Sequence, residues 1–151
     1  MKVVEGDLIE LALAGEFDVV LHGANCQCTM GAGIAKSIKL AFPEAFEADR
    51  STVKGDRAKL GTFSSAVVSR DGRELTIVNA YTQFDYRGPK VRVDYEAIRR
   101  AARAVRNEFD GKRIGYPRIG AGLGGGDWAR IRAILDEELS GLDHTLVEFK
   151  P

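Results

Sequence analysis

The stretch FDVVLHGANCQCTMGAGIAKSIKLAFPEAF, residues 17–46, decides the fold. It begins with an apolar, β-branched run over residues 17–22, which is typical of a buried strand. A glycine-containing loop follows, and from Gly31 apolar residues recur at intervals of three and four, which indicates a helix. Pro43 ends this helix and can open another, because proline restricts the residue before it and suits a first helical turn. A buried strand that leads through a loop into a helix is typical of a parallel α/β sheet.

The rest of the chain also alternates between predicted strands and predicted helices. Asp71-Gly72 is a two-residue hairpin signal, so at least one pair of strands is antiparallel. The sequence therefore predicts an α/β fold with a mixed, mainly parallel sheet and helices on both faces. No repeat, linker or low-complexity tract interrupts it, so we expect one domain over residues 1–151. Strands are predicted at 2–4, 17–22, 60–69, 75–81, 113–117 and 145–149, and helices at 8–13, from 31, from 44, 95–109 and 128–139.

The composition excludes several classes of protein. The 151 residues include 22 Lys+Arg and 22 Asp+Glu, which gives a formal net charge of zero. A chain without excess positive charge is not expected to coat nucleic acid or an anionic membrane, although a local anion site remains open. No apolar run approaches the roughly 20 residues that span a bilayer, and no signal segment opens the chain. We therefore expect a cytoplasmic protein, a monomer, with no membrane contact.

The two cysteines, Cys26 and Cys28, lie in the first glycine loop. One residue apart, they would form a strained disulfide ring. Zinc sites usually place more residues between paired cysteines and require a fourth ligand. His22 would be a third ligand, but no fourth is near in sequence, since His144 lies close to the far end. We therefore expect reduced thiols, no metal and no cofactor.

Two glycine-rich loops, at residues 25–34 and 119–126, each lie between a strand and a helix. Glycine lets the backbone approach a ligand, and the free N–H groups of a first helical turn favour an anion. Neither loop is a P-loop, because Lys36-Ser37 lies at the wrong distance from Gly33. The second loop matches the dinucleotide fingerprint, with Glu148 as a possible ribose-binding acid, but only one strand follows it. Two such loops suit a diphosphate held between them; the alternative is a pair of tight turns.

Several motifs in these loops and near the start resemble the macro domain family. They are GDLI at residues 6–9, HGANC at 22–26, MGAGIA at 30–35 and PRIGAGL at 117–123, followed by Trp128. Their order and spacing cover nearly the whole chain. The resemblance implies a three-layer α/β/α sandwich that binds ADP-ribose. Within the family, the chain resembles the branch of ADP-ribose-1″-phosphate phosphatases and terminal ADP-ribose glycohydrolases.

The resemblance implies a role for individual residues. Asp7 would accept a hydrogen bond from the adenine amino group, which is a donor. Asn25 would face the distal ribose, where its amide can hold a hydroxyl and orient a water. Tyr81 would either line the pocket of the distal ribose or pack in the core. The implied ligand-binding residues are Asp7, Leu8, Ala24, Gly31, Ala32, Gly33, Ile34, Tyr81, Ile119, Gly120, Ala121, Gly122, Leu123 and Gly124.

Catalytic groups are harder to assign. The terminal glycohydrolase branch uses a lysine near the end of the strand at 75–81 and an aspartate in the second glycine loop. These positions fall near Tyr81 and Gly124, so neither group is present. The candidates are then Asn25, with His22 or Asp127 assisting proton transfer. The alternatives are a buried, satisfied His22 and a helix cap at Asp127.

The expected reaction is hydrolysis at C1″ of the distal ribose. The substrate would be ADP-ribose 1″-phosphate, or ADP-ribose attached to a protein or a nucleic acid. A second hypothesis is a reader module that binds ADP-ribose without chemistry, which the missing lysine and aspartate favour. A third is a small Rossmann-type nicotinamide oxidoreductase, which would prefer NAD to free ADP-ribose.

Overall fold

The computed structural model describes residues 1–150 and contains one sheet of six strands in the order β1-β6-β5-β2-β4-β3. Strands β3 and β4 are antiparallel, and all other neighbours are parallel. Asp71 and Gly72 form the hairpin between β3 and β4, both at positive φ. The predicted mixed, mainly parallel sheet is confirmed. The strands are β1 (Lys2–Gly6), β2 (Val19–Asn25), β3 (Phe63–Arg70), β4 (Arg73–Gln83), β5 (Arg113–Tyr116) and β6 (Asp143–Phe149).

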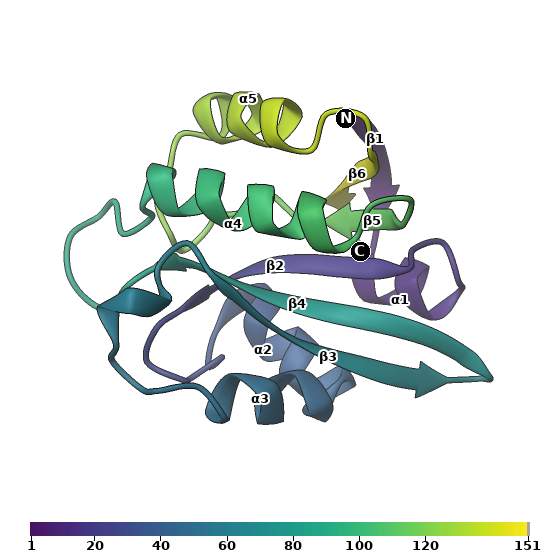
Figure 1. Cartoon of the computed structure of the whole chain (residues 1–151), viewed down its shortest axis with the longest axis horizontal. Coiled ribbons are helices and arrows are strands. Elements are labelled where there is room, and N and C mark those ends of the chain that lie inside the picture. Colours follow the sequence, from purple (N-terminus) through teal and green to yellow (C-terminus); the bar gives the residue numbers. More distant parts are fainter. Residues whose placement is uncertain (151) are drawn as a thin grey trace.

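Helices cover both faces of this sheet, so the predicted three-layer α/β/α sandwich is confirmed (Figure 1). One apolar core joins Ile98 of α4 and Leu135 of α5 to Leu21 of β2. A second core, on the opposite face, joins Ile38 of α2 to Val20 of β2. The helices are α1 (Leu8–Leu13), α2 (Gly33–Ala41), α3 (Pro43–Arg50), α4 (Tyr95–Glu108) and α5 (Trp128–Glu138), with a short 3-10 turn, η1, at Arg57–Lys59.

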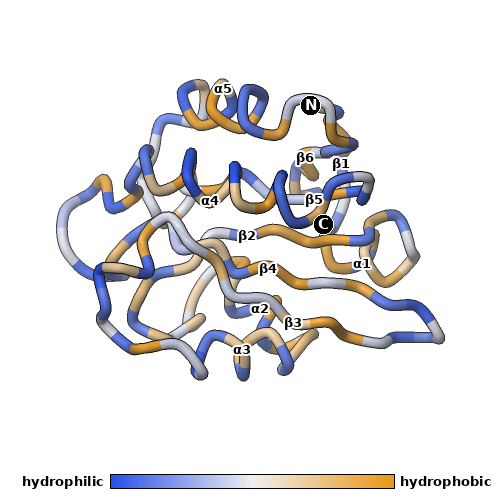
Figure 2. Tube along the Cα trace, in the orientation of Figure 1, coloured by the Kyte–Doolittle hydropathy of each residue, from blue (hydrophilic) through white to orange (hydrophobic). Residues whose placement is uncertain are grey.

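The central strands β2 and β4 are buried over most of their length and carry hydrophobic runs, whereas α4 alternates between hydrophilic and hydrophobic residues along its turns (Figure 2). A parallel strand with helices on both sides must bury both faces, while a surface helix buries one. Among residues 1–150, no helix combines the length and apolar character needed to cross a membrane.

The carboxyl ends of three neighbouring strands lie together at one edge of the sheet. Strands β4, β2 and β5 are adjacent and parallel, so their carboxyl ends lie at the same edge. The two glycine loops leave from the ends of β2 and β5. Strand β4 runs to Gln83, two residues beyond the predicted end at Tyr81. In open α/β sheets this edge is where ligands bind.

Candidate functional site

A cavity of about 1000 Å³ opens at the carboxyl ends of β2, β4 and β5. Both glycine loops line it. A Cβ placed on Gly33 would lie 3.2 Å from Leu123 Cδ1, so the loops approach each other across the cavity. The structure therefore brings together most of the residues that the sequence assigned to a ligand. The predicted residues in the lining are Ala24, Asn25, Gly31, Ala32, Gly33, Ile34, Ile119, Gly120, Ala121, Gly122, Leu123 and Gly124.

The amino end of α2 contributes to this cavity without a cap of its own. Ala32, at the N-cap position, makes no side-chain hydrogen bond to the first turn, and its methyl group has no acceptor to offer. The first-turn N–H groups of α2 are thus available to an anion. The amino end of α5 differs, because Asp127 there accepts a hydrogen bond from Ala129 N at 3.0 Å. Of the two helices, α2 is the better place for a phosphate.

The second glycine loop is held in shape from outside by residues 90–93. The carbonyl oxygen of Gly124 accepts hydrogen bonds from the backbone N–H groups of Arg92 and Val93, at 2.8 and 3.1 Å. Arg92 also donates from Nη1 to the carbonyl oxygen of Leu123 at 3.2 Å. Gly125 has φ +70, and a Cβ there would collide with the Lys90 carbonyl oxygen. The loop backbone is therefore fixed before any ligand arrives.

Asn25 ends β2 with its side-chain amide already oriented. Its Oδ1 accepts a hydrogen bond from Gln27 N at 2.8 Å, and its Nδ2 donates to Thr29 Oγ1 at 2.9 Å. Each atom can still make one further hydrogen bond. Thr29 lines the cavity as well. The amide can thus offer one donor and one acceptor to a ligand or a water.

The charged groups of the cavity are arginines. Arg92 and Arg118 line it, and within the described residues its lining includes no Asp, Glu, His or Lys. Arg118 is paired with Glu148 at 2.7 Å, and this hydrogen bond lowers the pKa of the Glu148 carboxyl. Arg92 makes its side-chain hydrogen bond to a carbonyl oxygen rather than to a carboxylate. The cavity therefore suits an anion and offers no side-chain carboxylate or imidazole as a general base.

His22 lies outside this lining. It is fully buried in β2, and its Nε2 donates to Asn79 Oδ1 at 2.6 Å. Asn79 in turn donates to the carbonyl oxygen of Ala45, in α3. Burial lowers the pKa of the His22 imidazole, so the ring is neutral near pH 7. The sequence left two roles open for His22, a buried structural residue or a proton carrier at the site. These contacts agree with the first role and do not support the second.

Tyr81 and Asp127 are also outside the lining. Tyr81 is 1% exposed, and its hydroxyl donates to Asp49 Oδ1 at 2.7 Å beneath α3. Burial raises the pKa of this hydroxyl. This geometry agrees with Tyr81 as a core aromatic residue and not as a residue that lines a ribose pocket. Asp127 acts as the cap of α5, the alternative that the sequence offered for it.

Asp7 and Leu8 stand at the end of β1, beyond the lining of the cavity. Asp7 Oδ1 accepts hydrogen bonds from both Ile9 N and Glu10 N, so it caps α1. No donor within residues 1–150 reaches its Oδ2. Leu8 is buried in the core on the α2 side. Asp7 thus keeps one acceptor open at the same sheet edge, whereas Leu8 has a packing role.

Sequence reasoning did not assign Thr29, Thr82, Gln83 or Arg92 to a ligand, although all four line the cavity. Thr82 and Gln83 were missed because the strand was predicted to end at Tyr81, although the β-branched Thr82 was a signal that it continues. Arg92 lies between β4 and α4, where no periodic pattern marks a site. Trp128 packs on the core and also lines the cavity.

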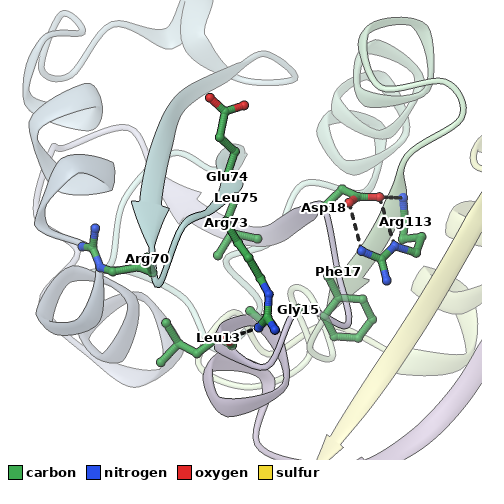
Figure 3. A pocket seen from close by; sticks show the side chains of 10 residues that line it. Leu13, Gly15, Phe17, Asp18, Arg70, Arg73, Glu74, Leu75 and Arg113 are labelled. Atoms are coloured by element: carbon green, nitrogen blue, oxygen red, sulfur yellow. Dashed lines mark hydrogen bonds and ion pairs between the residues drawn. The ribbon is translucent and has the colours of Figure 1, made fainter.

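A second, smaller cavity of about 260 Å³ lies between the start of β2 and the β3–β4 hairpin (Figure 3). Figure 3 shows the guanidinium of Arg113 turned toward Asp18 and that of Arg73 toward Leu13. Arg113 pairs with Asp18 at 3.0 Å, and Arg70 pairs with Glu44 at 2.8 Å. Two of its three arginines are already paired with carboxylates, and it is much smaller, so the larger cavity is the better candidate. Residues 1–150 contain no group of three His, Cys, Asp or Glu side chains placed to hold a metal ion.

Comparison with known proteins agrees with this geometry. The family model described as Macro domain matches residues 21–135. An uncharacterized 17.5 kDa protein from the tk-vs intergenic region of Enterobacteria phage T4 is 36% identical, over 100% of this chain and 97% of that protein. The ADP-ribose glycohydrolase OARD1 of Bos taurus is 28% identical, over 93% of this chain and 84% of that protein. The macrodomain of Thermus aquaticus DarG superposes with a TM-score of 0.76 at 23% identity, over 99% of this chain and 97% of that one.

Proposed function

Because this chain belongs to the macro domain family, we propose that its cavity binds ADP-ribose and that the protein hydrolyses a bond at C1″ of the distal ribose. The observation that carries the proposal is the pair of glycine loops facing each other across one cavity, with Asn25 in its lining. The relative from Bos taurus, which is named an ADP-ribose glycohydrolase, supports the same activity.

In the proposed complex the diphosphate lies between the two loops. The uncapped amino end of α2 and the Arg92 guanidinium favour its negative charge. The distal ribose meets Asn25, whose amide still has one donor and one acceptor to offer. The adenine extends toward the end of β1, where the open Oδ2 of Asp7 can accept its amino group.

The proposed reaction is attack of water on C1″. The lining supplies no carboxylate, imidazole or lysine, so a phosphate oxygen of the bound ligand takes the proton of the water. A bond forms between the water oxygen and C1″ while the bond to the leaving group breaks, and the leaving group receives the proton. Asn25 orients the water. Neither His22 nor Asp127 takes part in this scheme, since neither lines the cavity.

The leaving group is phosphate, a protein side chain or a nucleic acid, and a substrate panel decides among them. We expect one class to be turned over by the native chain and Asn25→Ala to lower kcat at least about tenfold, the loss of one well-placed hydrogen bond. The matched control is Asn107→Ala, because Asn107 is exposed on α4, outside the lining. Equal turnover by Asn25→Ala and the native chain would contradict the assignment of Asn25.

A second candidate function is a reader of ADP-ribose without turnover. The observation that favours it is the cavity lining, which supplies no side-chain general base. A reader binds ADP-ribose and leaves every substrate of the panel intact over long incubation. Release of free ADP-ribose or phosphate in that assay excludes it.

We also propose that the protein acts as a cytoplasmic monomer. The support for a reducing compartment is the pair of free thiols at Cys26 and Cys28. Light scattering at several concentrations tests the monomer, and a mass that rises with concentration argues against it.

A further inference from the structure

We propose that Gln83 holds the attacking water through its side-chain amide oxygen, together with Asn25 on the neighbouring strand. The inference rests on the proposed hydrolysis and adds a residue to it. It starts from the extra length of β4, which carries Gln83 to the carboxyl edge of the sheet and into the cavity lining.

Gln83 and Asn25 are neighbours across the β2–β4 pair. The register shifts between Ala24 and Asn25, and after this shift Asn25 is paired with Gln83. Both residues line the cavity. Two carboxamides therefore stand side by side at the ends of adjacent strands, where the distal ribose is placed.

The contacts of Gln83 fix which way its amide faces. Its nitrogen, Nε2, donates to the carbonyl oxygen of Asp85 at 3.2 Å. A carbonyl oxygen can only accept, so the amide oxygen must be on the other side. There Oε1 lies 3.1 Å from the position of a Cβ on Gly124, in the second glycine loop. Gln83 thus reaches from the strand end across to the loop.

The amide oxygen is free to accept a hydrogen bond. No donor in the part of the chain that the structure describes bonds to Gln83 Oε1, and this atom is not among the buried polar atoms that lack a partner. The atom is therefore accessible, and it belongs to a residue that lines the cavity. An acceptor so held, between Asn25 and Gly124, is placed to bind a water beside the ribose.

The water then has a partner for each of its hydrogen-bonding groups. It donates one hydrogen to Gln83 Oε1 and the other to a phosphate oxygen of the ligand, and it accepts from Asn25 Nδ2. Its remaining lone pair forms the bond to C1″ as the electron pair of the breaking bond leaves with the leaving group. The proton passes through the phosphate oxygen to the leaving group, and Gln83 is unchanged.

The test compares Gln83→Met, which has similar length and no strong acceptor, with Gln83→Glu, which keeps an acceptor oxygen. For each variant, kcat is measured on the substrate identified by the panel, and the Kd of ADP-ribose is measured by calorimetry. We expect Gln83→Met to lower kcat at least about tenfold, as for the loss of one hydrogen bond, with the Kd of ADP-ribose within about twofold. Gln83→Glu should recover most of kcat.

The matched control is Asn107→Met. It makes the same kind of change, from a carboxamide to a thioether, at an exposed position of α4 outside the cavity lining. We expect native kcat for it. Native kcat in Gln83→Met overturns the role of Gln83 and leaves the proposed function standing. A native chain that binds ADP-ribose but turns over no substrate overturns the hydrolysis itself.

Discussion

Asp7 combines a structural and a proposed binding role in one carboxylate. Oδ1 caps α1 and Oδ2 is left for the adenine. Asp7→Ala removes both, so we expect a loss of about 1 kcal/mol of stability together with weaker ADP-ribose binding. Asp7→Asn keeps a capping oxygen, so it should retain stability and weaken binding only. Thermal unfolding and calorimetry on the two variants separate the roles. Native affinity in both variants would show that adenine does not meet Asp7.

The sequence left two roles open for His22 and for Tyr81, and both cases have the same physical origin. Side chains of a strand alternate between its two faces. On β4, Val78 packs toward α4 and α5, while Asn79 and Tyr81 reach α3. His22 meets Asn79 on that same side. The sequence shows that these residues are near a strand end, but not that their face is covered by α3.

At the scale of elements, the amino end of α2 is predicted to bind the diphosphate. Ala32 has the extended backbone of an N-cap residue and no capping side chain. Ala32→Asp should raise the melting temperature, because aspartate caps a helix, and should weaken ADP-ribose binding through repulsion of the phosphates. Ala32→Ser supplies a neutral cap and is the control for charge. If Ala32→Asp bound ADP-ribose as tightly as Ala32→Ser, the diphosphate would lie elsewhere.

The second glycine loop gives another prediction, because two of its glycines differ in surroundings. A Cβ on Gly122 meets no atom within 4 Å, whereas one on Gly125 would collide with the Lys90 carbonyl oxygen. Gly122→Ala should keep native stability and lower the affinity for ADP-ribose, since the methyl group occupies space for the phosphates. Gly125→Ala should lower the melting temperature as well. Unchanged affinity in Gly122→Ala would mean that no ligand approaches that backbone.

The order and type of the main elements could be predicted from the sequence, because most of them have a clear hydrophobic period and a turn or cap at one end. Their ends were less certain. The last residues of β4 were missed, and with them Gln83, because an irregular segment rather than a glycine or proline follows the strand directly. The role of residues 90–93 in holding the glycine loop depends on contacts between distant parts of the chain. Such contacts have no local signal.

For the whole molecule, the buried histidine predicts a dependence of stability on pH. The pKa of His22 is lowered in the folded state from 6.5, so below pH 6.5 the unfolded chain binds a proton that the folded chain does not. The contribution of neutral His22 to the free energy of unfolding is complete above pH 6.5. It is lost as the pH falls from 6.5 toward the folded pKa. His144, whose pKa is also lowered by burial, acts in the same sense.

Chemical denaturation between about pH 7 and about pH 5 measures this effect. The free energy of unfolding should fall with pH in the native chain and fall less steeply in His22→Asn. Asp49, whose pKa is raised by burial, acts in the opposite sense in both proteins, so the difference between the two slopes isolates His22. Parallel slopes would show that folding does not lower the pKa of His22.

The central claim is that the cavity at the carboxyl edge of the sheet binds ADP-ribose with its distal ribose free. A calorimetric titration with ADP-ribose, with AMP and NAD as controls, tests it most directly. We predict a single site with micromolar or tighter affinity for ADP-ribose and much weaker binding of AMP and NAD. No heat with ADP-ribose would mean that the glycine loops serve another ligand or are simple turns. Binding of NAD as tight as that of ADP-ribose would favour a nicotinamide enzyme instead.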